Sequence, residues 1–270
     1  MQGVALTSLW IAATRAIETE RPEPLFQDPF ARRLAGDEGF AIVRALDAIS
    51  PPTRPPSLAL RTRYFDDELL AAATGTRQVV VLAAGMDARA YRLDWPSSTT
   101  LFEVDQPEVL AYKERTLDGA APRCDRRAVG IDLRDDWSAP LVNAGFDPKI
   151  AIAWLIEGLF PYLEETYVNG VLARVTELSP RASVLLFDVI GRSVLTSPWA
   201  QFVRDFVASL GAPWIFGTDE PEALVEAHGW DAIATDVSAV GHRFGRWPFP
   251  LVPRGTPGVP QTFFVKARRA

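Results

Sequence analysis

The stretch QVVVLAAG at residues 78–85 decides the fold, because it is an apolar run that stops at a glycine. Such a run is typical of a strand that is buried on both faces of a parallel sheet. Four comparable stretches follow along the chain: TTLFEVD, RRAVGID, KIAIAWLIEG and ASVLLFDVIG. Helical patterns or loops separate them, and strands at these intervals predict a parallel, doubly wound α/β sheet.

The C-terminal region departs from this alternation. Two strand-like stretches, WDAIATDV at 230–237 and QTFFVKARR at 261–269, are joined by a connection rich in proline and glycine. Since no helical stretch of the usual crossover length separates them, we expect an antiparallel hairpin that closes one edge of the sheet. The predicted sheet therefore has seven strands and is mostly parallel.

The N-terminal part is predicted to be helical. Thr7 or Ser8 is placed to cap a first helix, Pro29 occupies the favoured first turn of a second helix in PFARRLAG, and residues 58–73 form a third. We therefore divide the chain into a helical cap at 1–75 and a sheet domain at 76–270. Within the sheet domain, an insert at 191–228 is expected to form part of the substrate pocket.

Composition excludes several classes of protein. The chain has 270 residues, of which 48% are hydrophobic and 23% charged, so it can form a large core and is not disordered. A net charge of -6 without a basic stripe predicts no nucleic-acid partner. No apolar run is long enough to cross a membrane, no secretory signal pattern is visible, and the single cysteine suits a reducing compartment, so we expect a cytoplasmic protein.

Missing motifs narrow the chemistry further. Two histidines and one cysteine make a zinc site improbable, and we predict no metal. There is no Walker A loop, no G-x-S-x-G elbow and no G-x-G-x-x-G turn. P-loop enzymes, common hydrolases and nucleotide-linked oxidoreductases are all disfavoured.

Acidic residues end four of the five predicted parallel strands. Ligands of doubly wound sheets bind outside the carboxyl ends of the strands, so these residues are candidates for a binding site. A diphosphate needs backbone N–H groups and positive charge, whereas this set suits a ligand rich in hydroxyl and amine donors. The acidic residues are Asp105, Asp132, Glu157 and Asp188.

Asp105 lies 20 residues beyond Gly85, a spacing that matches an acidic side chain accepting hydrogen bonds from a ribose. S-adenosyl-L-methionine fits these features, because it contains adenosine and positive charge but no phosphate. Asp132 and the Leu133 N–H would then contact adenine, and Glu157 the ammonium group. Each acidic residue has the alternative of a helix N-cap or a solvated turn residue, and Asp188 is nearest to that alternative.

An arginine in RTRYFDDELL, residues 61–70, also needs a partner. Arg61 shares a helix face with two aromatic residues, so burial would require an anion beside it, either Asp28 or the carboxylate of a ligand. Arg63 precedes Asp67 by four residues, which predicts a surface ion pair.

Seven blocks of sequence together resemble the leucine carboxyl methyltransferase family, which includes bacterial S-adenosyl-L-methionine-dependent enzymes and polyketide O-methyltransferases of the tetracenomycin type. The blocks occur in the family's order: ATRAIETERPEPLFQDPFA, RTRYFDD, VVVLAAGMDARAYRL, FEVDQPEVLAYK, GIDLRDDW, EGLFPYL and PGVPQTFFVKARR. One departure is Ala83, which stands in AAG where family members often have a Gly-Ala-Gly turn.

The resemblance implies a Rossmann-like methyltransferase sheet with an N-terminal helical cap, and S-adenosyl-L-methionine as the cofactor, with S-adenosyl-L-homocysteine as product. It further implies cofactor contacts at six positions: Arg61, Gly85, Asp105, Asp132, Leu133 and Glu157.

The expected reaction is methyl transfer to an oxygen of a small-molecule acceptor in secondary metabolism. A carboxylate acceptor is already ionised and needs an arginine clamp, for which Arg61 is the first candidate and Arg63 the second. A phenol benefits from a base, for which His242 is the candidate. His242 has the alternative of a surface or packing residue. Tyr162 and the aromatic residues of the insert would line an apolar acceptor pocket. A protein C-terminal carboxylate and a non-catalytic S-adenosyl-L-methionine-binding protein are the alternative functions.

Overall fold

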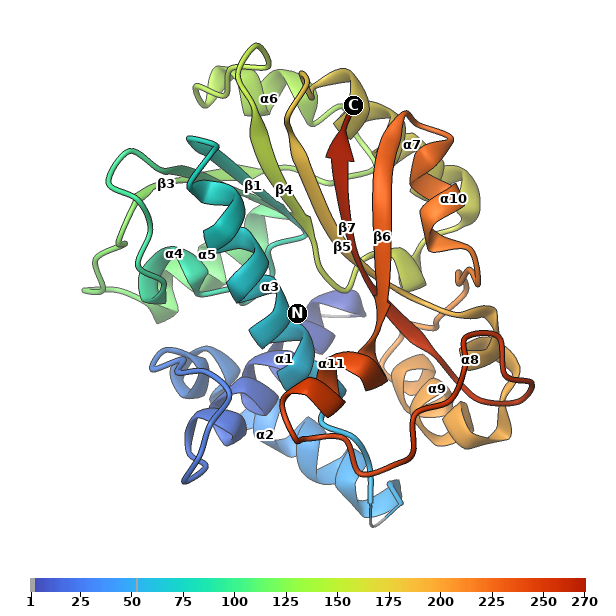
Figure 1. Ribbon diagram of the computed structural model, residues 1–270. Coiled ribbons are helices and arrows are strands. Elements are labelled where there is room, and N and C mark those ends of the chain that lie inside the picture. The colour runs from blue at the N-terminus through green and yellow to red at the C-terminus, as the bar shows by residue number, and fades with distance from the viewer. Residues whose placement is uncertain (1–2, 52) are drawn as a thin grey trace.

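The computed structural model describes residues 3–51 and 53–270 and contains a seven-stranded sheet (Figure 1). The strand order is β3-β2-β1-β4-β5-β7-β6, with β1 to β5 parallel and β7 antiparallel to both β5 and β6. This confirms the predicted mixed sheet with its C-terminal hairpin. The strands are β1 Gln78–Leu82, β2 Thr100–Asp105, β3 Asp125–Gly130, β4 Ile152–Ile156, β5 Val184–Ile190, β6 Trp230–Asp236 and β7 Thr262–Arg269.

Helices cover both faces of the sheet and extend past one end. The α-helices are α1 Val4–Thr19, α2 Ala31–Ile49, α3 Ser57–Ala73, α4 Arg89–Arg92, α5 Pro107–Thr116, α6 Ser138–Asn143, α7 Glu165–Glu177, α8 Arg192–Thr196, α9 Gln201–Ser209, α10 Pro221–Glu226 and α11 Val237–Arg243. Two 3₁₀ turns are η1 Phe160–Tyr162 and η2 Pro198–Ala200.

Alternate residues of the central strands feed two hydrophobic cores. On β1, Val79 and Val81 pack with α1 to α3, whereas Val80 and Leu82 pack with α6 and α7. This alternation follows from the two-residue period of a strand, and it explains why the buried strands are apolar on both faces.

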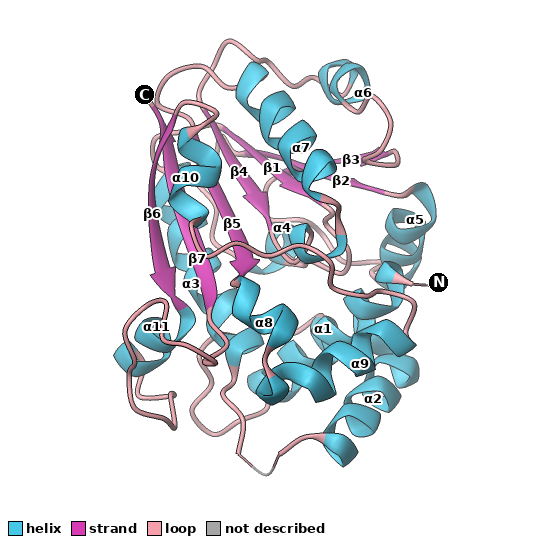
Figure 2. Ribbon diagram, turned by 90° about the vertical axis from the view of Figure 1, so that its right-hand side faces the viewer, coloured by secondary structure: helices cyan, strands magenta, loops and turns pink. Residues whose placement is uncertain are grey.

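The carboxyl ends of the parallel strands face a second group of helices. Figure 2 shows α1, α2, α8 and α9 gathered beyond the tips of β4 and β5. Gly39 of α2 allows a close approach to α1, because a Cβ at Gly39 would lie 2.5 Å from the Leu9 carbonyl oxygen. Ligand-sized space can therefore form between the strand tips and this helical layer.

The structure corrects three local expectations. Helix α1 begins at Val4, and Thr7 does not cap it, since the Thr7 hydroxyl donates back to the Val4 carbonyl at 2.6 Å. Ser8 bonds in the same way to Ala5. Pro29 does not lie in the first turn of α2, because the helix begins at Ala31. The helix continues to Ile49 across a kink at Gly36, whose φ is 55°.

Helix α11 lies inside the hairpin connection, and the proline- and glycine-rich pattern of that connection did not predict it. Among the described residues, no helix combines the length and apolar composition that a membrane crossing requires.

Candidate functional site

A cavity of about 1430 Å³ opens at the carboxyl ends of the parallel strands. Every residue predicted to bind the cofactor lines it, and Asp188 does so as well. Ligand sites commonly measure about 300–1,000 Å³, so this cavity has room for a cofactor together with a second molecule.

The turn after β1 is bonded directly to the end of β2. The Gly85 N–H donates to Asp105 Oδ2 at 2.6 Å, and the Gln106 N–H donates to Asp105 Oδ1 at 2.7 Å. Gly85 has φ 45°, a left-handed conformation that favours glycine. Burial raises the pKa of Asp105 above its usual value, against the effect of these two hydrogen bonds. Within the described chain Asp105 has no ion-pair partner, so each oxygen keeps a lone pair for a ligand hydroxyl.

Two residues after β3 lie at the outer end of the same cavity. Asp132 pairs with Arg134, whose Nη2 lies 2.6 Å from Asp132 Oδ2, and this hydrogen bond lowers the pKa of Asp132. Among the backbone bonds of the described residues, the Leu133 N–H donates to no protein acceptor. Both groups therefore suit the edge of an adenine ring.

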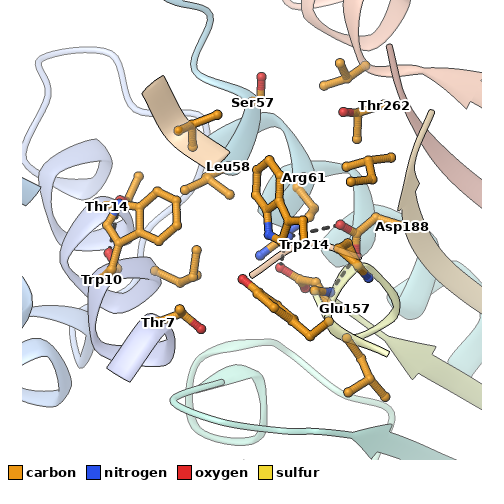
Figure 3. Close-up of a pocket in the computed structure, with 18 of the residues that line it drawn as sticks. Thr7, Trp10, Thr14, Ser57, Leu58, Arg61, Glu157, Asp188, Trp214 and Thr262 are labelled. Carbon is orange, nitrogen blue, oxygen red and sulfur yellow. Dashed lines mark hydrogen bonds and ion pairs between the residues drawn. The ribbon is translucent and has the colours of Figure 1, made fainter. Parts of the chain in front are cut away.

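Arg61 joins the tips of β4 and β5. Its Nε donates to Glu157 Oε1 at 2.9 Å and its Nη1 to Asp188 Oδ2 at 3.0 Å, and Figure 3 shows the three side chains together. Asp188 Oδ1 also accepts the Gly158 N–H at 2.6 Å. Burial raises the pKa of Asp188, while the charge of Arg61 acts in the opposite direction.

Of the two partners predicted for Arg61, Asp28 is wrong. Asp28 pairs with Arg15 at 2.8 Å instead, because the segment after α1 folds back against that helix. Arg61 lies on α3, which packs against β4 and β5, and so it meets the carboxylates at their ends. The predicted surface pair of Arg63 and Asp67 is present at 2.8 Å.

Sequence reasoning missed a second arginine of the site. Arg89 on α4 donates to Asp66 at 2.7 Å, pairs with Asp87 and lies 2.8 Å from Glu157 Oε2. Burial alone would raise the pKa of Glu157, but Arg89 and Arg61 hold it below its usual value. Likewise the pKa of Asp87 is about 2, because nearby cations, Arg89 first, outweigh its burial. The available signal was the run MDARAYR directly after Gly85.

One buried oxygen in this cluster is incompletely used. Glu157 Oε2 accepts no hydrogen bond within the described chain, although Arg89 lies close to it. Arg89 compensates the charge of this oxygen without a well-aligned hydrogen bond, and an ammonium group would supply one. The amino-acid end of S-adenosyl-L-methionine therefore fits the chemistry of this position.

The two remaining candidates differ in position. Tyr162, in η1, lines the cavity. His242 lies in the last turn of α11, where it is exposed, and it is not among the residues that line the cavity. The structure thus brings Tyr162, but not His242, together with the cofactor-binding candidates.

The seven-stranded sheet is that of a Rossmann-like, S-adenosyl-L-methionine-dependent methyltransferase, and comparison with known proteins supports this class. Residues 8–176 match the model of the leucine carboxyl methyltransferase family. The chain belongs to the leucine carboxyl methyltransferase family.

Relatives and solved structures agree with this assignment. Two relatives carry names that assign them provisionally as S-adenosyl-L-methionine-dependent methyltransferases. The protein from Mycobacteroides abscessus is 37% identical, and the match covers 91% of this chain and 85% of that protein. The protein from Rhodococcus jostii is 38% identical, and the match covers 94% of this chain and 91% of that protein. The crystal structure of a Thermobifida fusca protein titled as a methyltransferase has a TM-score of 0.64 at 16% identity, covering 100% of this chain and 96% of that one. Human N-acetylserotonin methyltransferase, solved with S-adenosyl-L-methionine, has a TM-score of 0.51 at 12% identity, with coverages of 97% and 66%. At these identities the solved structures show the fold alone.

Proposed function

We propose that this methyltransferase acts on an oxygen atom, a carboxylate or a phenol, of a small aromatic, polyketide-like molecule in secondary metabolism. The observation that carries the proposal is the single cavity, which joins the charged strand ends to a wall rich in apolar and aromatic side chains. That wall comes from α1, from the predicted insert at 191–228 and from the segment before β7.

The proposed cofactor position uses the strand ends in order. Asp105 accepts hydrogen bonds from the ribose, Asp132 and the Leu133 N–H contact adenine, and Glu157 accepts the ammonium group. Arg61 donates through Nε and Nη1 to protein carboxylates, which leaves its Nη2 for the carboxylate of the cofactor.

S-adenosyl-L-methionine, when bound, supplies a methyl group on a positively charged sulfur. The protein's own contribution is to hold the acceptor oxygen in line with that methyl group and to exclude water. A carboxylate needs no base for this reaction, because it is already ionised at neutral pH. We propose that Tyr162 contacts the acceptor, since it lines the cavity and His242 does not.

The test is transfer of a labelled methyl group from S-adenosyl-L-methionine to defined acceptors. The panel contains phenols, aromatic carboxylic acids and a peptide ending in a free leucine carboxylate. The proposal expects label in at least one small aromatic acceptor and its loss in Asp105→Ala. Label only in the peptide would favour a protein carboxyl methyltransferase, and cofactor binding without transfer to any acceptor would favour a non-catalytic protein.

A further inference from the structure

Seven of the eight tryptophans of this chain fall into two groups. Three core tryptophans donate their indole N–H to the protein: Trp95 to the Arg89 carbonyl, Trp154 to Ser179 and Trp230 to Thr176, each at 2.8 Å. Four others line the cavity, and none of these donates to a group of the described chain: Trp10, Trp199, Trp214 and Trp247. Within the described residues, none of these four indole nitrogens is a buried atom without a partner, so each N–H is open to solvent or to a ligand in the cavity.

Trp10 is held in a fixed orientation. It lies on α1, is 6% exposed, and meets the Phe206 ring edge-on at a centroid distance of 6.2 Å. The close approach of α2 at Gly39 fixes α1 at the preceding residue, Leu9. The Trp10 ring is therefore a rigid wall of the cavity.

The backbone directly after Trp214 is fixed by hydrogen bonds to two other segments. The N–H groups of Ile215 and Phe216 donate to the Pro161 carbonyl at 2.7 and 3.2 Å, and the Thr218 N–H donates to the Ile190 carbonyl at 2.9 Å. Figure 3 shows Trp10 on α1 and Trp214 among the side chains that line the cavity together with Arg61 and Glu157. Trp214 thus belongs to the same cavity as the proposed amino-acid end of the cofactor, which the acceptor must approach.

The charges around the cavity argue against an anionic acceptor. Each arginine that lines it already faces a carboxylate; these are Arg15, Arg21, Arg54, Arg61 and Arg134. By contrast, two lining carboxylates, Asp105 and Asp236, have no cation partner within the described residues. Of these, only Arg15 and Arg61 are largely buried, and once Arg61 Nη2 holds the cofactor carboxylate, clamping a second carboxylate with either arginine would break a buried ion pair, which is costly.

We propose that Trp10 and Trp214 bind a flat, uncharged aromatic acceptor, stacking on its rings and donating their indole N–H groups to its oxygen atoms. The inference rests on the proposed function and chooses between its two acceptor classes, since it favours a neutral phenolic compound over an aromatic carboxylate. Aromatic contacts and indole donors replace the arginine clamp as the means of orientation.

The test measures the binding of two probes, 2-naphthol and 2-naphthoate, by titration calorimetry with saturating S-adenosyl-L-homocysteine. We expect 2-naphthol to bind at least about tenfold more tightly than 2-naphthoate, because no unpaired cation is available to the anion. Trp10→Phe and Trp214→Phe keep a ring but lose the N–H, and each should weaken 2-naphthol binding about three- to tenfold. Trp214→Ala should weaken it by more than about tenfold.

Trp137→Phe is the matched control, because Trp137 is a buried tryptophan outside the cavity and should leave 2-naphthol binding unchanged. S-adenosyl-L-homocysteine affinity and circular dichroism show that each variant is folded. Unchanged 2-naphthol binding in the Trp10 and Trp214 variants, tighter binding of 2-naphthoate, or no binding of 2-naphthol would each overturn the inference. Any of these results together with methyl transfer to an oxygen would leave the proposed function standing. Absence of transfer together with the expected probe binding would overturn the proposed function alone.

Discussion

The two ends of the cavity are built by opposite means. The proposed cofactor end consists of charged residues at the tips of adjacent strands, and most of these charges are paired, Asp105 being the exception. The proposed acceptor end consists of tryptophans and other apolar residues from segments far apart in the sequence. On the proposed function, the sheet itself defines the cofactor site, whereas the surrounding helices and loops define what is methylated.

The largest effect should come from removing the arginine that joins the two strand tips. Arg61→Ala leaves Glu157 and Asp188 buried and close together without their shared cation, so we expect a loss of about 3–5 kcal/mol in the free energy of unfolding. Urea denaturation measures this loss. The control is Arg63→Ala on the same helix, whose exposed pair with Asp67 should contribute less than about 1 kcal/mol. Equal losses in the two variants would show that the buried cluster does not hold the cofactor end together.

A smaller effect is expected at the ribose position. Asp105→Ala removes a carboxylate that accepts from Gly85 and Gln106 and is proposed to accept from the cofactor. We expect the binding free energy of S-adenosyl-L-homocysteine to weaken by about 1–3 kcal/mol in titration calorimetry. Asp94→Ala, at a side chain that is 92% exposed, should have no effect. Retained affinity in Asp105→Ala would remove this residue from the site.

The same residue predicts a pH dependence. Burial raises the pKa of Asp105 in the free protein, and ribose hydroxyls would stabilise its ionised form, so the bound state has the lower pKa. Cofactor affinity should then be full at pH values well above the free-state pKa of Asp105 and should fall over the range of pH in which the free protein takes up that proton. Calorimetric titrations across this range measure the change, and Asp105→Asn should reduce the slope. A wild-type affinity that does not vary with pH would contradict this role.

The smallest effect concerns the turn after β1. Ala83 has φ 53°, a left-handed conformation that costs a residue with a Cβ about 1–2 kcal/mol. Ala83→Gly should therefore raise the free energy of unfolding by about 1 kcal/mol. Ala84→Gly, at a neighbour that is buried and does not have a positive φ, should lower it instead. A loss of stability in Ala83→Gly would mean that the packing of the Ala83 methyl group stabilises the fold by more than the backbone strain destabilises it.

The cofactor end was largely predictable, because its residues follow local rules. An apolar run that ends in Gly85 and an acidic residue at the end of the next strand are visible without a structure, and both line the cavity. Asp188 was discounted, because its significance depends on Arg61, which lies 127 positions away on another element. The sequence also placed Asp188 at the end of its strand, whereas it lies within β5, two residues before the strand ends.

The acceptor end was predictable only in composition. The sequence showed an excess of aromatic residues in 191–228, but it did not show that Trp214 is held against Pro161 by its neighbours or that Trp10 belongs to the same cavity. Such pairings depend on long-range packing, which no periodic pattern reports. His242 illustrates the same limit, since helix α11 carries it to the surface.

A crystal structure of the protein with S-adenosyl-L-homocysteine tests the division of the cavity most directly. The account predicts the ribose hydroxyls on Asp105, the adenine beside Asp132 and Leu133, and the ammonium group on Glu157, with the space between Trp10 and Trp214 left free. A ligand lying between the two tryptophans, or one that makes no contact with Asp105, would contradict it.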